Sequence, residues 1–126
     1  MSKRRPVLEK RIQADIEVAI GSESDLLLLR NSCGLAKYIH EATGKMWHVP
    51  YGLGDGSPDL VGILRWKAIG VWFCLEVKCP GEKATAEQEK AHRIWRSFGA
   101  LVFVVSSVEE ARAALETARE VLMGVA

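Results

Sequence analysis

The sequence predicts an α/β protein in which a central mixed β-sheet is flanked by helices, and two observations lead to this class. First, residues 71–105 contain an apolar strand (71–78), a segment with helical spacing (86–98) and a near-continuous apolar strand (100–105). A strand–helix–strand unit joins parallel strands by a crossover. Second, the strand-like residues 59–66 are followed closely by 71–78, as in an antiparallel hairpin. A sheet with both kinds of pair is mixed.

The chain has 126 residues and a formal net charge of +1, and we expect one domain over residues 1–126. Because the charge is close to zero, a nucleic-acid partner would need a local basic patch. Cys33, Cys74 and Cys79 contain no CxxC pair, and with the histidines they match no zinc motif. No apolar run approaches membrane-spanning length, and no apolar region follows the basic start. We therefore expect a cytoplasmic protein without membrane contact.

The first element is a helix over residues 7–20, where apolar side chains recur at helical spacing and Gly21 provides a stop. Glu9, Gln13 and Glu17 lie four apart and share a stripe beside the apolar one. From the spacing alone, a solvated helix face is the favoured interpretation of this stripe.

The following segments are short. Residues 26–30 are a leucine-rich run that predicts a buried strand, 33–46 predict a loop or a broken helical turn, and 46–51 predict a short strand. A loop with three glycines then leads to Pro58, which fixes the backbone just before Asp59. This loop lacks the GxxxxGK[ST] pattern of a phosphate loop, and an ordinary turn explains it equally well.

Two carboxylates and a lysine fall on the predicted hairpin. Strand residues two apart point to the same face, so Glu76 and Lys78 project together while Val77 turns into the core. With the turn centred between residues 68 and 69, Asp59 lies opposite Lys78 and diagonal to Glu76, about 7–8 Å away between backbones. A shift of the register by one residue would turn Asp59 away from the pair.

Two capping boxes, Thr85 to Gln88 and Ser107 to Glu110, open the last two helices. In the helix over 86–98 the expected apolar face consists of Ala91, Ile94, Trp95 and Phe98. The strand over 100–105 is of the kind that is buried on both faces. The closing helix is amphipathic, with its apolar positions at Val108, Ala111, Leu115, Ala118 and Leu122.

The charged residues of the hairpin suit metal-assisted hydrolysis of a phosphodiester. Oxygen ligands from Asp59 and Glu76 fit a hard divalent cation, Mg²⁺ or Mn²⁺, rather than zinc. Such an ion lowers the pKa of bound water, and Lys78 can hold the attacking water or stabilise negative charge on the phosphate. An ordinary cross-strand pair between Asp59 and Lys78 on an exposed sheet face is the alternative.

The ordered series of motifs resembles a known family. Pro58-Asp59 followed by Glu76-Val77-Lys78 resembles the PD-(D/E)xK nuclease superfamily. More specifically, GLGDGSPDLVGIL followed by FCLEVKCPGEKATAEQEKAHRIWRSFGALVFVVSSVEEA resembles the virus-type replication-repair nuclease (VRR-NUC) domain, over about residues 8–112. The resemblance implies a restriction-endonuclease-like core and a metal-dependent endonuclease. It also implies Asp59, Glu76 and the backbone carbonyl of Val77 as metal ligands.

The resemblance assigns roles to further residues. It implies Lys78 as the catalytic lysine, and it implies a glutamate on the first helix in a pattern like ExxIQ, which Glu9 to Gln13 match. Glu9 then becomes the preferred additional ligand or water contact, and Glu17 is the fallback. Gln88 matches a family glutamine near the site, while its place in the capping box explains it equally well.

The implied partner is DNA. A short chain resembles the standalone phage or bacterial members, whose homodimers would suit a branched substrate such as a four-way junction. In the cell such an enzyme would work at the nucleoid. A non-catalytic DNA-binding module, or action on single strands or RNA, stays an alternative. Candidate phosphate contacts are the basic residues Lys3, Arg4, Arg5, Lys10, Arg11, Lys83, Lys90, Arg93 and Arg96.

Overall fold

The computed structural model describes residues 4–125 and the side chains of residues 6–124. Lys3 therefore lies outside the described residues, as do the side chains of Arg4 and Arg5. In chain order the elements are α1 (Arg4–Ile20), β1 (Leu26–Arg30), β2 (Gly34–Ile39), β3 (Met46–Tyr51), β4 (Leu60–Trp66), β5 (Ile69–Val77), α2 (Ala86–Ser97), β6 (Leu101–Val105) and α3 (Val108–Val125). No helix in the described part of the chain is long and apolar enough to cross a bilayer.

A four-stranded sheet in the order β1-β4-β5-β6 forms the centre of the fold. The strands β1, β4 and β5 pair antiparallel, whereas β5 and β6 are parallel and are joined through α2. The predicted mixed sheet with flanking helices is therefore confirmed. The strand β6 lies at an edge of the sheet, and Val104 on it is 39% exposed, so the expectation of burial on both faces holds only in part.

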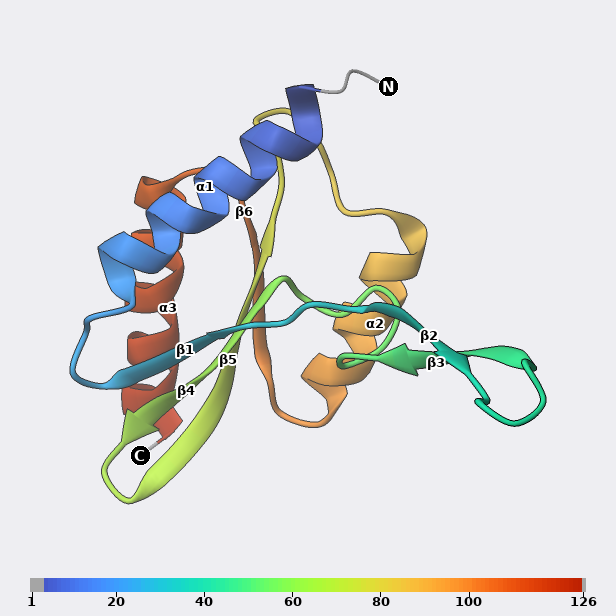
Figure 1. Ribbon diagram of the computed structural model, residues 1–126. Coiled ribbons are helices and arrows are strands. Elements are labelled where there is room, and N and C mark those ends of the chain that lie inside the picture. Colours follow the sequence, from blue (N-terminus) through green and yellow to red (C-terminus); the bar gives the residue numbers. More distant parts are fainter. Residues whose placement is uncertain (1–3, 126) are drawn as a thin grey trace.

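The helices form two layers around the sheet, with α1 and α3 on one face and α2 on the other (Figure 1). Side chains along β5 alternate between the two faces of the sheet, so each face can pack against one helical layer. Phe73, Leu75 and Val77 face the large core that includes the buried residues of α1 and α3. Cys74 belongs to a smaller cluster on the other face, with Trp95 of α2 packed against it. Glu76 and Lys78 share the parity of Cys74 and therefore face the α2 side.

The hairpin of β4 and β5 has a different register from the predicted one. Trp66 pairs with Ile69 across a two-residue turn, and Val61 pairs with Cys74 rather than with Glu76. Two-residue turns match the twist of the flanking strands, and Lys67 adopts a positive φ of 56° to make this one. The predicted turn was therefore centred one residue too late, which changes every cross-strand partner by two residues. Because side chains alternate with a period of two, this shift leaves every residue on its predicted face.

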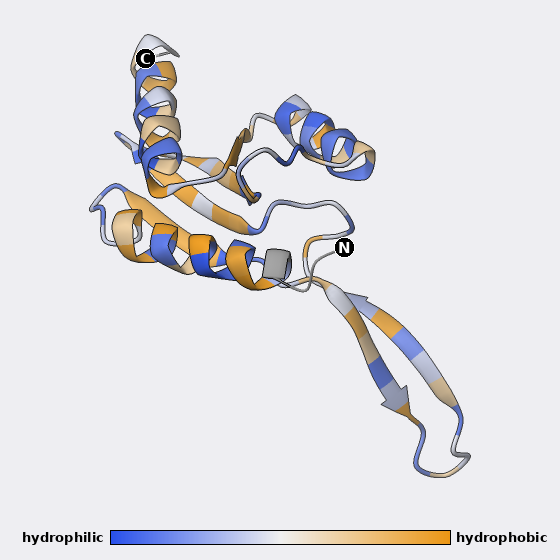
Figure 2. Ribbon diagram, turned by 90° about the horizontal axis from the view of Figure 1, so that it is seen from above, coloured by the Kyte–Doolittle hydropathy of each residue, from blue (hydrophilic) through white to orange (hydrophobic). Residues whose placement is uncertain are grey.

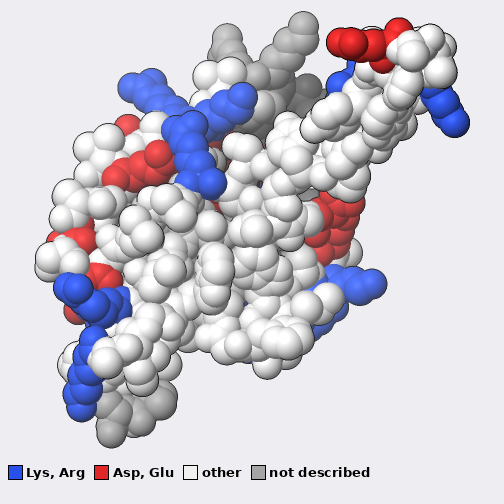
Figure 3. Space-filling view, turned by 60° about the horizontal axis from the view of Figure 1, so that its bottom comes forward, with Lys and Arg blue, Asp and Glu red and all other residues white. Residues whose placement is uncertain are grey.

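Two predictions for the first half of the chain were also wrong. The strand over 26–30 forms as expected, but β1 is an edge strand, and Leu27 and Leu29 are more than half exposed. Residues 33–46, expected as a loop or broken turn, contain β2. It pairs with β3 in a separate two-stranded sheet that projects from the body as an arm (Figure 2). The few charged side chains of the arm gather toward its tip (Figure 3).

The C-terminal elements follow the sequence closely. The predicted capping box of α2 is present, with Thr85 and Gln88 bonded reciprocally. The predicted apolar stripe of α3 is buried, from Ala111 through Leu115 to Leu122. The predicted apolar face of α2 was wrong in part, because Phe98 is 89% exposed and the buried residue of that helix is His92.

An ion pair ties the last helix to the turn before β1. The Arg119 guanidinium donates from Nε and Nη2 to the two carboxylate oxygens of Asp25, at 2.9 and 2.8 Å. Arg119 also bonds the more exposed Glu116 on its own helix. The hydrogen bond from Arg119 lowers the pKa of Asp25 below its ordinary value of 3.8. Because the folded state favours the ionised carboxylate, this pair stabilises the fold above that pH.

We expect Asp25→Asn to lower the free energy of unfolding by about 1 kcal/mol at pH 7. Since the pKa of Asp25 is depressed in the folded state, the deficit should shrink as the pH falls below 3.8. Urea unfolding at pH 7 and near pH 3 measures this, with Glu116→Gln as a control that should cost only a few tenths of a kcal/mol. A deficit that does not change with pH would contradict an ionic origin.

Candidate functional site

Asp59 and the end of β5 come together on the α2 side of the sheet. Asp59 Oδ2 accepts a hydrogen bond of 2.8 Å from the backbone N–H of Val77. The observed register, extended by one residue past Leu60 and Leu75, sets Asp59 opposite Glu76. In a strand, the carbonyl of a residue points to the same side as its N–H, so the Val77 carbonyl faces Asp59 as well. The structure thus brings two predicted carboxylates and the predicted backbone ligand to one place.

The loop before Asp59 is held from two sides. Asn31, which directly follows β1, donates from Nδ2 to Ser57 Oγ and to the Pro58 carbonyl at 2.7 and 2.8 Å, and its Oδ1 accepts from Leu53 N–H at 3.2 Å. The Asn31 N–H also bonds the carbonyl of Asp59 at 2.9 Å. Asn31 was not among the predicted site residues, because no motif marks an asparagine whose partners lie more than 20 positions away.

Glycine at position 56 permits the loop to approach α2. Gly56 has a φ of +76°, and a Cβ built there would lie 2.8 Å from the carbonyl oxygen of Glu87. The backbone of α2 beside Gln88 therefore leaves no room for a side chain at this point. The loop that carries Asp59 and the helix that carries Gln88 are held at a fixed separation by this contact.

Glu76 is a buried acid, with 1% of its surface exposed. Its carboxylate lies 3.2 Å from Gln88 Nε2 and 3.2 Å from His92 Nε2. The pKa of Glu76 is raised to about 9, mainly by burial and then by a hydrogen bond with Asp59 and the charge of Asp59, against the opposing effect of Lys78. Glu76 is therefore shifted toward its neutral, protonated form.

Gln88 has both of the roles that the sequence left open. Its side-chain carbonyl accepts from Thr85 N–H at 2.9 Å, which completes the capping box, while its amide donates to Glu76. One amide group supplies an acceptor to the helix end and a donor to the acid. The helix cap therefore also orients Glu76.

His92 also orients Glu76, and it was not among the predicted site residues. It is 1% exposed and lies one helical turn after Gln88, so both side chains reach Glu76 from the same face of α2. Burial and the charge of Arg96 lower the pKa of His92. Because Glu76 is shifted toward its neutral form, the pair is a hydrogen bond between neutral groups rather than an ion pair. The spacing of four from Gln88 was the available signal.

Lys78 and Glu9 complete the group. Lys78 is 8% exposed, and its N–H bonds the carbonyl of Val105 on β6. Burial raises the pKa of Glu9, and the nearby charges of Asp59 and Glu82 raise it too, while Lys78 lowers it. One carboxylate oxygen of Glu9, Cys79 Sγ and one oxygen of Glu82 lie within 4.8 Å of one another. The N-terminal half of α1 thus delivers an acid to the end of β5.

Glu17, the fallback for Glu9, is placed elsewhere. Its carboxylate accepts from Arg30 Nε at 2.7 Å and from Gln13 at 3.4 Å. Eight residues of helix separate it from Glu9 by about 12 Å. Of the two glutamates on α1, Glu9 is the one that interacts electrostatically with Asp59, Glu76 and Lys78.

The donor set fits a hard divalent cation. Asp59 and Glu76 offer carboxylate oxygens, Val77 offers a backbone carbonyl, and Glu9 adds a further carboxylate nearby. Glu76 is buried beside Asp59, so positive charge in addition to that of Lys78 would stabilise the two acids when both are ionised. A cation bound between the two carboxylates would supply that charge.

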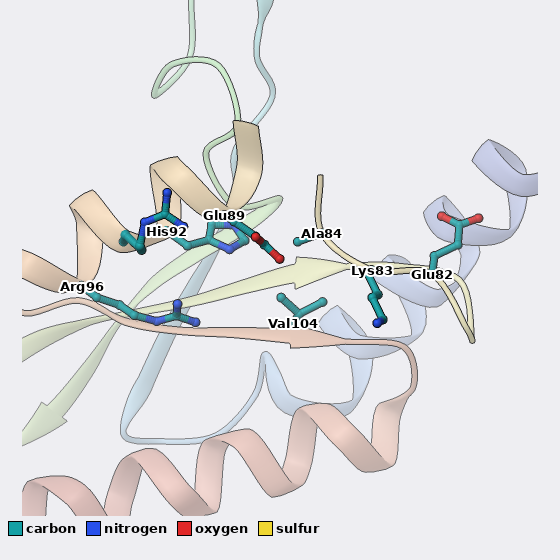
Figure 4. A pocket seen from close by; sticks show the side chains of 8 residues that line it. Glu82, Lys83, Ala84, Glu89, His92, Arg96 and Val104 are labelled. Atoms are coloured by element: carbon teal, nitrogen blue, oxygen red, sulfur yellow. The ribbon is translucent and has the colours of Figure 1, made fainter. Parts of the chain in front are cut away.

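Basic side chains lie on two elements near this group. Lys10 and Arg11 are exposed on α1, and Lys90 is exposed on α2. Lys83, Arg93 and Arg96 line an open pocket of about 410 Å³ between α2, β6 and the segment after β5 (Figure 4). Glu82, Glu89 and His92 line the same pocket, so it carries acids as well as bases and adjoins the residue that contacts Glu76. Arg96 also donates to the Val102 carbonyl at 2.6 Å.

This chain is similar to known proteins in its fold. No family model and no curated protein matches the sequence. Among solved structures, the fold is similar to a chain described as a VRR_NUC domain, with a TM-score of 0.56 and 25% sequence identity over 86% of this chain and 95% of that one. The resemblance to the VRR-NUC domain is thereby confirmed, and this likeness suggests a nuclease domain.

We expect Gly56→Ala to cost about 2–3 kcal/mol of folding free energy, because it combines backbone strain with a close approach to Glu87. Gly81→Ala is the matched control. Gly81 has a similar φ of +87° but has no atom within 4 Å of an added Cβ, so only strain of about 1 kcal/mol applies. Urea unfolding of both variants measures the difference. Equal costs would show that the contact with α2 does not hold the loop.

Proposed function

We propose that this protein is a Mg²⁺- or Mn²⁺-dependent endonuclease that hydrolyses phosphodiester bonds in DNA. The observation that carries the proposal is the convergence of Asp59 and the buried Glu76, with Lys78 on the same face of β5. The similarity of the fold to a VRR_NUC domain supports the same reaction class. Neither an ordinary surface ion pair nor a structural core needs a buried acid beside a second carboxylate.

Asp59, Glu76 and the Val77 carbonyl would hold the cation, with Glu9 placed to bind it directly or through water. When bound, such an ion supplies Lewis-acid activation of water and neutralises charge on the phosphate. Gln88 and His92 keep the Glu76 carboxylate in one orientation, as groups around metal ligands commonly do. The N–H of Val77 fixes Asp59 in the same way.

Lys78 would act on the reacting phosphate. In hydrolysis the water oxygen forms a bond to phosphorus, one P–O ester bond breaks, and the leaving oxygen takes up a proton. The ammonium group of Lys78 donates hydrogen bonds to the attacking water or to the phosphate oxygens, where negative charge increases. Its burial strengthens this interaction, because little water screens it.

The substrate proposed is DNA, bound through basic residues on both sides of the acids. Lys10 and Arg11 on α1 and Lys83, Lys90 and Arg93 near α2 would contact phosphates. We further propose that the enzyme works as a homodimer on branched DNA such as a four-way junction, since two-fold symmetry of the protein would match that of the substrate.

We expect Asp59→Ala and Lys78→Ala each to reduce metal-dependent cleavage at least about 100-fold, because each removes a group that acts on the reacting phosphate or on its ion. The assay compares duplex, flap, four-way junction and single-stranded substrates with Mg²⁺, Mn²⁺ and EDTA. Circular dichroism and thermal unfolding check that both variants fold. Robust cleavage by either folded variant would refute the assignment, and DNA binding without turnover in any metal would favour a non-catalytic DNA-binding module.

The two glutamates of α1 provide a second, matched prediction. Glu9→Gln should lower cleavage about tenfold or more and weaken Mn²⁺ binding in titration calorimetry, because it removes a carboxylate near Asp59 and Lys78. Glu17→Gln changes the same residue type on the same helix but disturbs only the ion pair with Arg30. It should leave both readouts unchanged. Equal losses in the two variants would show that Glu9 acts only through the stability of α1.

A further inference from the structure

An open pocket with an aromatic lining lies between the second half of α2, the strand β5 and the start of the loop that leads to Asp59. It has a volume of about 350 Å³ and is lined by Leu53, Trp72, Ile94, Trp95, Phe98 and Ala100. We name it the aromatic pocket. Trp72 and Trp95 meet edge to face in it, with ring centroids 5.9 Å apart. Among the described residues, no charged side chain lines this pocket.

The lining of the aromatic pocket is open to solvent. Phe98 is 89% exposed, and Trp72 and Ile94 are about half exposed. Large apolar side chains that gather on a surface in this way mark a binding site more often than a surface that meets only water. The volume is at the small end of the range for ligand pockets, about 300–1,000 Å³. The pocket therefore suits one flat ring system rather than an extended partner.

The aromatic pocket lies on the same face of the sheet as the two acids. Trp72 and Glu76 are four positions apart on β5, so both point to the α2 side, about 13 Å from each other along the strand. The helix α2 extends over the same interval, because Gln88 bonds Glu76 and Trp95 contacts Trp72. A nucleic-acid strand with one phosphate at the acids therefore has a nucleotide a few positions away at the pocket.

We propose that the aromatic pocket binds an unpaired nucleobase of the substrate strand, within a few nucleotides of the phosphate that is cleaved. The proposal rests on the proposed function, because it needs a nucleic-acid strand at Asp59 and Glu76. A base inside a duplex is stacked and paired, and it must leave the helix before it can enter a protein pocket. The substrate class is therefore DNA with an unpaired stretch beside the scissile phosphate.

Charge and size favour a nucleobase over a protein as the occupant. The faces of a base are flat and uncharged, and they stack on aromatic side chains whatever the base is. The phosphate of the same nucleotide needs a cation, and the exposed Lys90 precedes Ile94 by one helical turn, on the outer side of the pocket. A standard protein interface uses about 20–30 residues on each side, whereas six residues line this pocket.

DNA binding without turnover tests the proposal. Fluorescence anisotropy measures the affinity of the full chain in EDTA for a labelled duplex that carries a short unpaired flap. A single abasic site, which keeps the phosphate and removes the base, is moved through the flap one position at a time. At one position the loss of the base should weaken binding about tenfold, because one base stacked on aromatic side chains contributes about that much affinity. Abasic sites at the other positions should have little effect.

Matched variants of Phe98 separate stacking from general effects on the fold. Phe98→Leu keeps an apolar side chain but removes the ring, whereas Phe98→Tyr keeps the ring, and both change an exposed position. Phe98→Leu should bind the intact flap DNA about tenfold more weakly and should lose its sensitivity to the abasic position. Phe98→Tyr should bind like the wild type, as should Val18→Ala, which removes an exposed apolar side chain from α1. A fully paired duplex should bind equally to all of them.

Wild-type affinity that does not depend on the abasic position would overturn the proposal, and so would equal weakening of flap and duplex binding in Phe98→Leu. If Phe98→Leu binds the flap normally but changes the sedimentation of the free chain, the pocket belongs to a protein contact and the proposal is also overturned.

These outcomes are distinct from those for the proposed function. An abasic effect without cleavage in any metal would refute the nuclease and keep the base pocket. Cleavage that is lost in Asp59→Ala, without an abasic effect, would keep the nuclease and refute the pocket. The binding assay is repeated with Lys78→Ala in Mg²⁺, and a chain that binds no DNA in either condition would overturn both.

Discussion

The burial of one carboxylate is the constraint on which the rest of the site depends. Glu76 lies in an apolar strand with almost no contact with water, and its nearest charged neighbour is another acid, Asp59. Such an arrangement costs free energy unless donors and positive charge surround it. Gln88 donates a hydrogen bond from α2, His92 on the same helix is hydrogen-bonded to the acid, and Lys78, which directly follows the strand, provides charge. The capping of α2 and the burial of His92 are therefore part of the site and not only of the fold.

The alternation of side chains along β5 places core residues on one face of the strand and site residues on the other. Its odd-numbered residues Phe73, Leu75 and Val77 face the core formed with α1 and α3. Its even-numbered residues lead from the buried thiol of Cys74 to Glu76, and Lys78 directly follows the strand. The main core can thus stay apolar while the other face carries charge. The main chain of Val77 connects the two, because its side chain packs in the core while its N–H holds Asp59.

Local sequence patterns were sufficient to predict the elements that have a clear hydrophobic periodicity. They failed for elements and contacts that have no such pattern. The mixed sheet, the capping box of Thr85 and Gln88 and the face of Glu76 follow from local patterns. The hairpin turn was misplaced by one residue, and the strand pairing by two, because lysine is not a residue type that indicates a positive φ. The strand β2 was missed because apolar and polar residues mix on a ribbon exposed on both faces. Asn31 and His92 act across long separations, which spacing rules do not detect.

The hydrogen bonds of Asn31 link the arm to the segment that carries Asp59. Residues 52–58 run from the last residue of the arm to Asp59, and Asn31 holds both ends of this short connection. Restricting one end of such a segment removes conformational freedom from the other, at about 1–2 kcal/mol per ordered residue. Asn31 therefore orders the segment before Asp59 in advance of substrate binding, so that less conformational entropy is lost when substrate binds. The position of the acid and the end of the arm are linked through this one side chain.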